Sequence, residues 1–496
     1  MRVVIPLLYL LIILLTGCAV TKDNYNPDKK YSKEQIQNDF RFLKEVFEKK
    51  HPSLYWYTSK ETLNQIYDSL YKSIPDSMTE LQFGWKILAP YTNRIRCGHT
   101  SFSMSKGWNK YIKKTVIPSF PLHLKVWKDT MVVIGNLNKK DSVFKNGMLI
   151  TAINGIKNED IIQEIFSYLP LDGYANNVNY IRLSSNFPFY HRNVFGIYNK
   201  YKVEYIDSAG NKRMATLPMF VPEKDTAAKK KKAPAISKAQ AKKQFREFSR
   251  NMVIEDSTST ATITLNTFSK RGGTHLRSFF RRSFRTIKKK KIEHLILDLR
   301  RNGGGDVSMY VLLTKYLRHT PFKVADTTYA VTKSLHPYAK HFTDRMVNSL
   351  ALRFLTKKHK DGNYHFGYWE RKEFDPKINN HFYGKLYVLI NGPTFFASTL
   401  FCNAIKGQEN TLLIGEEAGG GWYGNSGIII PDLILPNTKL RVRLPFFRIV
   451  QYNHIDEKGS GVTPDIFVGP SIDAIKKEQD SKIEYTKALI QQSTTK

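Results

Sequence analysis

The stretch LILDLRRNGGGD, residues 295–306, decides the fold expected for this chain. A strongly apolar run ends here in three consecutive glycines and an aspartate, and a helical pattern follows. Glycines at such a strand-to-helix turn let the backbone turn tightly and expose its N–H groups at the helix entrance. Two such donors aimed at one point form an anion site or an oxyanion hole. A phosphate loop would carry Lys and then Ser or Thr directly after the glycines, and that pair is missing.

A second strand-to-helix turn is expected at LINGPTFFASTL, residues 389–400. Such an elbow is a common place for a nucleophile, because the side chain at the turn is held exposed beside helix-terminal N–H groups. From about residue 252 onward strands and helices alternate, which predicts an α/β layered core. Strands are expected at 261–268, 294–300, 385–390 and 411–415, helices at 273–290, 306–317 and 397–406, and an insertion that packs over one edge at 335–382.

The first half of the chain divides by its pattern into two units. From Ser32 the apolar residues recur at helical spacing, and Ser32 with Gln35 forms a capping box, so a helical domain is expected over 31–110. Residues 111–221 are richer in short β-type runs, with Asn154-Gly155 as a turn signal, and predict a compact β-rich domain. Within it, a helix is expected at 158–169 and a hairpin at 202–217.

The remaining segments connect or follow these units. A Lys/Ala-rich stretch over 222–250 predicts a solvated linker, and its run Lys229–Lys232 leaves a polyanion-binding tail as the alternative. The α/β core is expected over 251–475, and a C-terminal helix or tail over 476–496.

The amino terminus predicts export and a lipid anchor. A positive start is followed by a nearly continuous apolar run of 13 residues, Val3–Leu15, which is too short to span a bilayer but suits a signal peptide. The run ends in Leu-Thr-Gly-Cys, which looks like a bacterial lipobox and implies acylation of Cys18. We therefore expect a signal peptide over 1–18, a tether over 19–30, and a cell-envelope lipoprotein facing the periplasm or the outer surface. An ordinary secretory signal with a chance cysteine is the alternative.

Composition and charge narrow the partners. The chain of 496 residues has 77 Lys and Arg against 43 Asp and Glu, a formal net charge of +34 that would attract polyanions. No zinc-finger spacing, basic zipper or aromatic RNA-binding signature accompanies this charge, so nucleic-acid binding is not expected. No Cys and His cluster has zinc spacing, and neither a metal nor a cofactor is predicted. Cys97 and Cys402 could pair in an oxidising compartment, which their spacing alone does not decide.

Six landmarks follow one another in an order that resembles the tail-specific, C-terminal-processing serine peptidase family, in its tricorn-core-like branch. They are GHT at 98–100, GMLITAING at 147–155, LDLRRNGGG at 297–305, LINGPTFFAST at 389–399, GEEAGGG at 415–421 and GVTPD at 461–465. The resemblance covers roughly residues 35–470. It implies an α/β fold with a crotonase/ClpP-like core, a PDZ-like module and an N-terminal helical domain. It also implies peptide-bond hydrolysis by acyl transfer, on unfolded proteins or peptide C-terminal tails.

The resemblance assigns the site residue by residue. The family's nucleophile is the first serine of a Thr-Phe-Ser-Ala-Ser turn, and that position is Phe396 in this chain. The N–H of Ala397 would form the oxyanion hole together with that of Gly303 or Gly304. His99 matches the general base.

Two further positions of the family pattern are less closely matched. A late acid could only be Asp456 or Glu457. The lysine-dyad branch of the family would need Lys where Gly421 stands, so a Ser-Lys mechanism is not supported.

The substitution at Phe396 leaves three hypotheses. In the first, Ser398 supplies the nucleophile of a working endopeptidase, although a two-residue shift on a helix points its hydroxyl about 200° away and favours a satisfied hydroxyl in the first helical turn. In the second, the chain is a silent relative that binds peptide or protein tails, for example by adding a peptide strand to the PDZ-like sheet. In the third, basic charge makes it an envelope-binding scaffold. His99 could then be only a buried, hydrogen-bonded histidine, and Trp422-Tyr423 could line a groove or simply pack.

Overall fold

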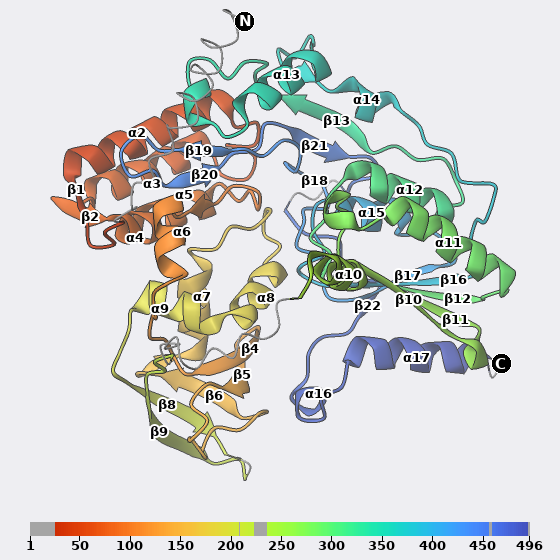
Figure 1. Cartoon of the computed structure of the whole chain (residues 1–496), viewed down its shortest axis with the longest axis horizontal. Coiled ribbons are helices and arrows are strands. Elements are labelled where there is room, and N and C mark those ends of the chain that lie inside the picture. The colour runs from red at the N-terminus through yellow and green to blue at the C-terminus, as the bar shows by residue number, and fades with distance from the viewer. Residues whose placement is uncertain (1–24, 208, 223–235, 456–458, 495–496) are drawn as a thin grey trace, which may run out of the picture.

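The computed structural model describes residues 25–207, 209–222, 236–455 and 459–494. The α/β core forms one half of the molecule, and a helical unit with a β-rich unit forms the other, as Figure 1 shows. The expected mixed α/β fold is confirmed. The predicted signal peptide, with Cys18, and the first half of the tether lie outside the described residues.

The core is built on a six-stranded, mostly parallel sheet. Its elements are β10 (Arg250–Glu255), β11 (Thr260–Leu265), α11 (Leu276–Lys289), β12 (His294–Asp298), α12 (Val307–Leu317), β16 (Lys385–Ile390), α15 (Ala397–Ile405), β17 (Thr411–Gly415), β22 (Ile466–Phe467), α16 (Ile472–Lys476) and α17 (Ser481–Thr494). The strand order is β10-β11-β12-β16-β17-β22, and only the β10–β11 pair is antiparallel. Helices α11, α12 and α15 cover one face, and α17 covers the other (Figure 1).

Burial on both faces explains the apolar run that opened the sequence analysis. Leu295 and Leu297 pack into the large cluster beneath α11, α12 and α15, whereas Ile296 points to the opposite face and packs with Ile490 of α17. Parallel strands covered on both sides therefore read as continuous rather than alternating apolar sequence. The strands expected at 385–390 and 411–415 are confirmed at those bounds, and the strand expected at 294–300 ends two residues early, at Asp298.

The β-rich unit is an antiparallel sheet covered by three helices. Its elements are β4 (Leu122–Trp127), β5 (Thr130–Asn136), β6 (Leu149–Ile153), β7 (Ile156–Lys157), α7 (Asn158–Phe166), α8 (Asn177–Ser185), α9 (Phe187–Phe195), β8 (Lys200–Ile206) and β9 (Lys212–Pro218). The strand order is β4-β5-β6-β8-β9, with β7 paired to β6. The predicted turn and hairpin are confirmed: Asn154 and Gly155 have φ of 52° and 80°, and β8 pairs with β9.

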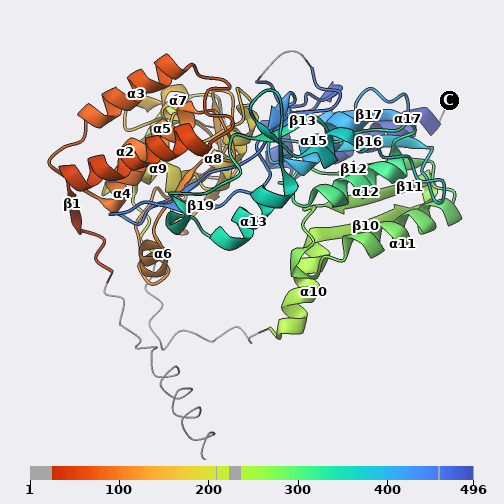
Figure 2. The same ribbon diagram turned by 90° about the horizontal axis from the view of Figure 1, so that it is seen from above.

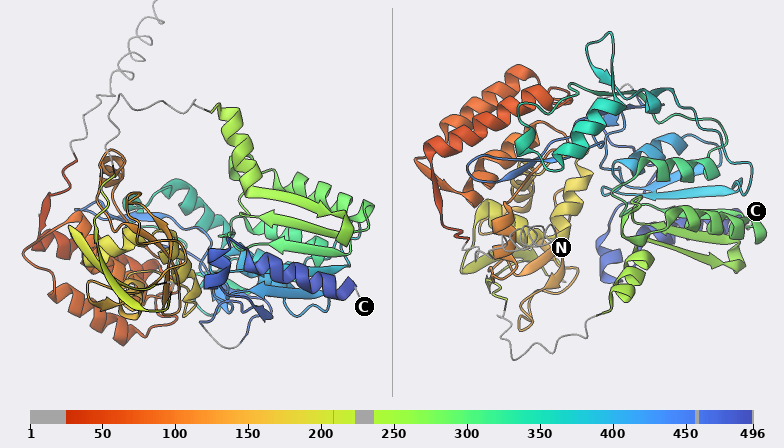
Figure 3. Two further views of the ribbon diagram at one scale, coloured as in Figure 1. Left: turned by 90° about the horizontal axis from the view of Figure 1, so that it is seen from below. Right: turned by 45° about the horizontal axis from the view of Figure 1, so that its top comes forward.

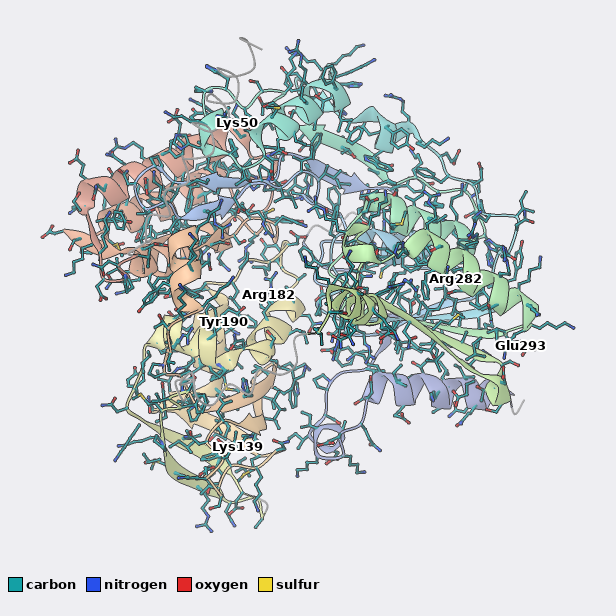
Figure 4. All side chains as sticks on the ribbon, viewed as in Figure 1. Lys50, Lys139, Arg182, Tyr190, Arg282 and Glu293 are labelled. Atoms are coloured by element: carbon teal, nitrogen blue, oxygen red, sulfur yellow. The ribbon has the colours of Figure 1, made fainter. Side chains whose placement is uncertain are left out.

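The helical unit shares its core with segments from much later in the chain. Its elements are β1 (Lys30–Ser32), α2 (Lys33–Lys50), α3 (Lys60–Lys72), β2 (Ser77–Thr79), α4 (Glu80–Phe83), α5 (Ala89–Arg94), β3 (Phe102–Ser103) and α6 (Lys106–Ile112). The capping box of Ser32 and Gln35 is confirmed. Lys50, labelled in Figure 4, donates to the carbonyl oxygens of Ser334 and His336 at 2.8 and 3.2 Å. The helical unit is thus held against the second half of the chain.

The connection between the halves consists of short strands and helices (Figure 1). They are β13 (Ala325–Ala330), α13 (Arg345–Leu355), β14 (Lys357–Lys358), β15 (Tyr364–His365), α14 (Gly367–Arg371), β18 (Gly424–Asn425), β19 (Asp432–Ile434), β20 (Arg441–Arg443) and β21 (Arg448–Gln451). Strand β20 pairs with β3 of the helical unit, and β21 pairs with β13 and β18. The insertion at 335–382, expected to pack over an edge of the α/β core, therefore does not contact that core alone. Leu335 and Leu352 lie in the core of the helical unit.

One predicted linker segment is helical. Within 222–250, expected to be a solvated linker, α10 (Lys238–Ser249) begins at a capping box of Ser237 and Gln240. No glycine or proline interrupts residues 237–249, so a local cap suffices to start a helix that charge alone did not suggest. Figures 2 and 3 show α10 projecting from the core. None of the helices in the described ranges is long and apolar enough to cross a membrane.

Candidate active site

The turn between β16 and α15 has the strained geometry of a nucleophile elbow. Phe396 precedes the helix with φ 48° and ψ −110°, a conformation that is a genuine outlier for a bulky residue. Strain of this kind persists only where the surroundings over-determine it, and it clusters at functional sites. The side chain is 8% exposed, and its ring packs against Gly427, where an added Cβ would be 1.9 Å from a ring atom.

The glycine turn and the elbow are joined by Asn302. Its carbonyl oxygen accepts a hydrogen bond from the N–H of Phe395 at 3.1 Å, and its side-chain oxygen accepts one from the N–H of Gly304 at 3.0 Å. Gly304 has φ 94°, and an added Cβ would be 2.9 Å from the nitrogen of Ala397. The two turns predicted from the sequence therefore touch, and only glycine allows this approach.

Two backbone donors are available where the sequence analysis placed the oxyanion hole. In the part of the chain that the structure describes, the N–H groups of Gly303 and Ala397 have no backbone acceptor. Gly304 does not qualify, because its N–H is taken by Asn302. An added Cβ on Gly303 would meet nothing within 4 Å, so this glycine borders open space. Gly303 with Ala397 is thus the usable pair of the two that were considered.

His99 reaches the elbow, as the family resemblance requires. Its ring centroid is 5.0 Å from that of Phe395 and 5.6 Å from that of Phe396. Its Nδ1 is buried without a hydrogen-bond partner among the described residues, so the alternative of a fully hydrogen-bonded histidine is not realised. Burial lowers the pKa of His99, and the carboxylate of Asp172 opposes this shift. The imidazole is therefore neutral near pH 7, the form that a general base needs.

Asp172 is the site residue that the sequence analysis missed. It comes from the β-rich unit and is 2% exposed. Its Oδ1 accepts a hydrogen bond from the N–H of Gly98 at 2.6 Å, and its Oδ2 accepts one from the N–H of Gly421 at 3.4 Å. One carboxylate thus connects the histidine loop, the β-rich unit and the glycine-rich segment. The only sequence signal was a lone acid in the run LPLDGY at 169–174.

Ser398 is not placed as a nucleophile. The residue is fully buried, and its Oγ has no hydrogen-bond partner in the described structure, His99 included. The expectation of a satisfied hydroxyl is therefore wrong. The nearby Thr394 and Thr399 hydroxyls donate to the carbonyl oxygens of Leu299 and Thr394. Ser398 instead follows its helix into the apolar core, as the 200° rotation predicts.

Several groups near His99 bear on metal and disulfide chemistry. Ligand atoms of Cys97, His99 and Asp172 lie within 4.8 Å of one another. Burial raises the pKa of the Cys97 thiol to about 11, so the thiolate that a metal or a nucleophilic role needs is disfavoured. Cys97 and Cys402 are both buried and free, so the pairing that the sequence left open does not occur. Asp456 and Glu457, the candidates for the late acid, lie outside the described residues.

A second set of ligand atoms belongs to the β14–β15 hairpin. His359, Asp361 and His365 offer ligand atoms within 4.8 Å of one another, and the other ring nitrogen of His365 contacts Glu370 at 2.8 Å. This hairpin contributes no residue to the elbow.

Comparison with known proteins agrees with this geometry. The model of peptidase family S41 matches residues 259–468, which include both strand-to-helix turns. Residues 259–468 thus form a domain of peptidase family S41. Two solved structures of mature CPAF have a fold similar to that of this chain. The complex with lactacystin is 14% identical, with a TM-score of 0.63 over 93% of this chain and 98% of that one. Mature CPAF alone is 13% identical, with a TM-score of 0.61 over 92% and 96%. No curated protein matches the sequence significantly.

The chain thus brings together most of the predicted site. His99, Gly303, Phe396 and Ala397 converge from three segments of the chain, and Asp172 joins them. The group that the arrangement lacks at the elbow is a hydroxyl.

Proposed function

We propose that this protein, with its S41 peptidase domain, is a catalytically silent relative that binds peptides or protein tails beside the elbow. The observation that supports the loss of catalysis is the presence of Phe396 at the elbow. A benzyl ring cannot attack a carbonyl carbon, and it fills the volume in which a tetrahedral intermediate would form. Loss of the nucleophile alone typically removes about a million-fold of rate.

The rest of the elbow favours retained binding over wholesale decay. The strained φ of 48° at Phe396, the free N–H groups of Gly303 and Ala397, and a neutral His99 all remain. Strain of this kind would relax if nothing required the turn. A peptide carbonyl oxygen can accept from the two free donors without being attacked. The β-rich unit adds a sheet to which an extended peptide can pair.

The proposal extends to the location of the protein. The apolar run and the motif Leu-Thr-Gly-Cys support a lipoprotein held in the cell envelope by acyl chains on Cys18. Two or three chains give firm anchoring where a single chain would not. Exported, unfolded or partly folded proteins would then be the source of the bound tails.

The test compares binding and cleavage in one preparation. The full chain in detergent is incubated with an unfolded protein, with fluorescent peptides and with a fluorophosphonate probe. We expect peptide binding by fluorescence anisotropy, no cleavage products and no probe labelling. Labelling that disappears in Ser398→Ala but persists in the matched control Ser185→Ala would instead establish a working endopeptidase. Absence of any peptide binding would refute the binding role.

A further inference from the structure

Two histidines and an aspartate of the β14–β15 hairpin face one another, away from the elbow. A ring nitrogen of His359, a ring nitrogen of His365 and a carboxylate oxygen of Asp361 lie within 4.8 Å of one another. A tetrahedral Zn²⁺ ion, with bonds of about 2.0–2.1 Å, holds its ligand atoms about 3.3 Å apart, so small side-chain rotations would bring all three atoms onto one ion. The set escaped the search for Cys and His spacing in the sequence because a carboxylate supplies one ligand.

The turn of the hairpin fixes the position of Asp361. The backbone N–H of His359 donates to the carbonyl oxygen of Asn363 at 2.9 Å, and Gly362 completes the turn with φ 84°. Asn363 holds the Asp361 carboxylate through two hydrogen bonds of 3.0 Å, since its backbone N–H donates to Oδ1 and its side-chain amide donates to Oδ2. A ligand that is already held in place loses little conformational freedom when an ion binds.

Glu370 orients the ring of His365. Its Oε1 is 2.8 Å from Nδ1 of His365, whereas Nε2 of the same ring faces Oδ2 of Asp361 at 2.9 Å. Histidines that bind metal ions commonly donate their other ring N–H to a carboxylate, which fixes the tautomer and raises the basicity of the ligand nitrogen. Glu370 is placed to accept that hydrogen bond from Nδ1. A metal ion would then replace the proton between Nε2 and Asp361, and this proton would pass to water.

His359 is available to an ion from solvent. It is exposed, and among the described residues its ring makes no hydrogen bond but stacks on that of His365, with centroids 4.5 Å apart and planes 30° apart. The carboxylates of Asp361 and Glu370 carry two negative charges, which match a divalent cation. The lysines of the hairpin are exposed, so solvent screens their repulsion of a cation. Imidazole ligands favour Zn²⁺ over Mg²⁺ and Ca²⁺, which prefer oxygen ligands.

We propose that His359, Asp361 and His365 bind a Zn²⁺ ion, with a water molecule as the fourth ligand. The ion would join the hairpin to α14, the helix that carries Glu370. Oε1 of Glu370 also accepts a hydrogen bond from the N–H of Thr328 on β13 at 2.7 Å, and α14 lies beside β13 (Figure 1). The site would therefore fasten the hairpin to the sheet that connects the two halves of the molecule. It does not depend on peptide binding at the elbow.

Zinc binding by the full chain, without an affinity tag and in detergent, tests the proposal. The protein is stripped with a chelator, dialysed and titrated with Zn²⁺ by isothermal titration calorimetry, and we expect one ion per chain. Glu370→Gln should weaken binding about 10–100-fold, the usual effect of removing a carboxylate that orients a ligand. His359→Gln and Asp361→Asn remove ligands and should weaken it further. His275→Gln, which removes an exposed histidine ahead of α11, is the matched control and should leave the affinity unchanged.

Three results would overturn the proposal. The first is the absence of saturable Zn²⁺ binding, and the second is binding that survives both His359→Gln and Asp361→Asn. If His99→Ala removed that binding instead, the ion would lie at Cys97 and His99 and not in the hairpin. The third is displacement of the ion by millimolar Ca²⁺, which would mean that carboxylates alone hold it.

Trypsin cleavage tests whether the ion fastens the hairpin. The hairpin carries exposed trypsin sites at Lys357, Lys358 and Lys360, whose cleavage is followed by mass spectrometry. Zn²⁺ at about 100 times its Kd should slow this cleavage by up to about 100-fold, because only the closed hairpin binds the ion. His359→Gln should melt like the wild type without metal, yet its cleavage should not respond to Zn²⁺. Equal cleavage of the wild type with and without Zn²⁺ would refute the fastening role.

Discussion

The contact between Phe396 and Gly427 allows a sharp test of where the substituted side chain lies. An alanine Cβ at Gly427 would be 1.9 and 2.1 Å from two ring atoms of Phe396, although the φ of Gly427 is not in the left-handed region and alanine suits its backbone. Gly427→Ala should therefore lower the free energy of unfolding by about 1–3 kcal/mol, the usual effect of overpacking.

The same substitution should change sign once the ring is gone. In a Phe396→Ser background no ring atom opposes the new methyl, so Gly427→Ala should stabilise by about 0.4–1 kcal/mol through the unfolded chain. The coupling between the two sites is then about 1.4–4 kcal/mol.

Urea unfolding of the four proteins, followed by intrinsic fluorescence, measures this coupling. Gly303→Ala, where an added Cβ meets nothing within 4 Å, is the control for glycine replacement near the site. An equal loss from Gly427→Ala in both backgrounds would show that the ring does not lie on Gly427.

Two further predictions concern stability. Gly304→Ala should destabilise by about 1–3 kcal/mol, because φ is 94° and the new Cβ would be 2.8 Å from the carbonyl oxygen of Phe395; an unchanged urea midpoint would contradict the close approach of the two turns. Burial lowers the pKa of His51 to about 3 and that of His191 to about 4. When the pH is lowered from 7 to 5, these histidines take up protons in the unfolded chain but not in the folded one. The free energy of unfolding should therefore decrease by about 2 kcal/mol for each histidine. His191→Phe should flatten the measured slope, and an unaltered slope would refute this origin.

The local parts of the fold could be predicted because local chemistry sets them. The strand at 385–390 is apolar on both faces, as in a sheet covered on both sides. The segments 295–306 and 389–400 each change from an apolar strand to a helix through a glycine-containing turn, a pattern that few folds have. The family resemblance of these turns then predicted that His99 lies beside the elbow, and its ring contacts that of Phe396.

The parts that failed depend on distant segments. Asp172 meets Gly98 and Gly421 through contacts that no spacing encodes. The hydroxyl of Ser398 was expected to be satisfied, yet the carbonyl oxygen of Thr394, one helical turn earlier, accepts from the Thr399 hydroxyl and the Gly419 N–H instead.

Among the described residues, the group missing from a working elbow is a hydroxyl, and mass spectrometry of Phe396→Ser tests this most directly. After exposure to a fluorophosphonate, the variant should gain one adduct on the peptide spanning 391–400, and adding His99→Ala should abolish it, while the wild type stays unlabelled. A folded Phe396→Ser variant that takes up no probe, or a wild type that is labelled on Ser398, would contradict the account.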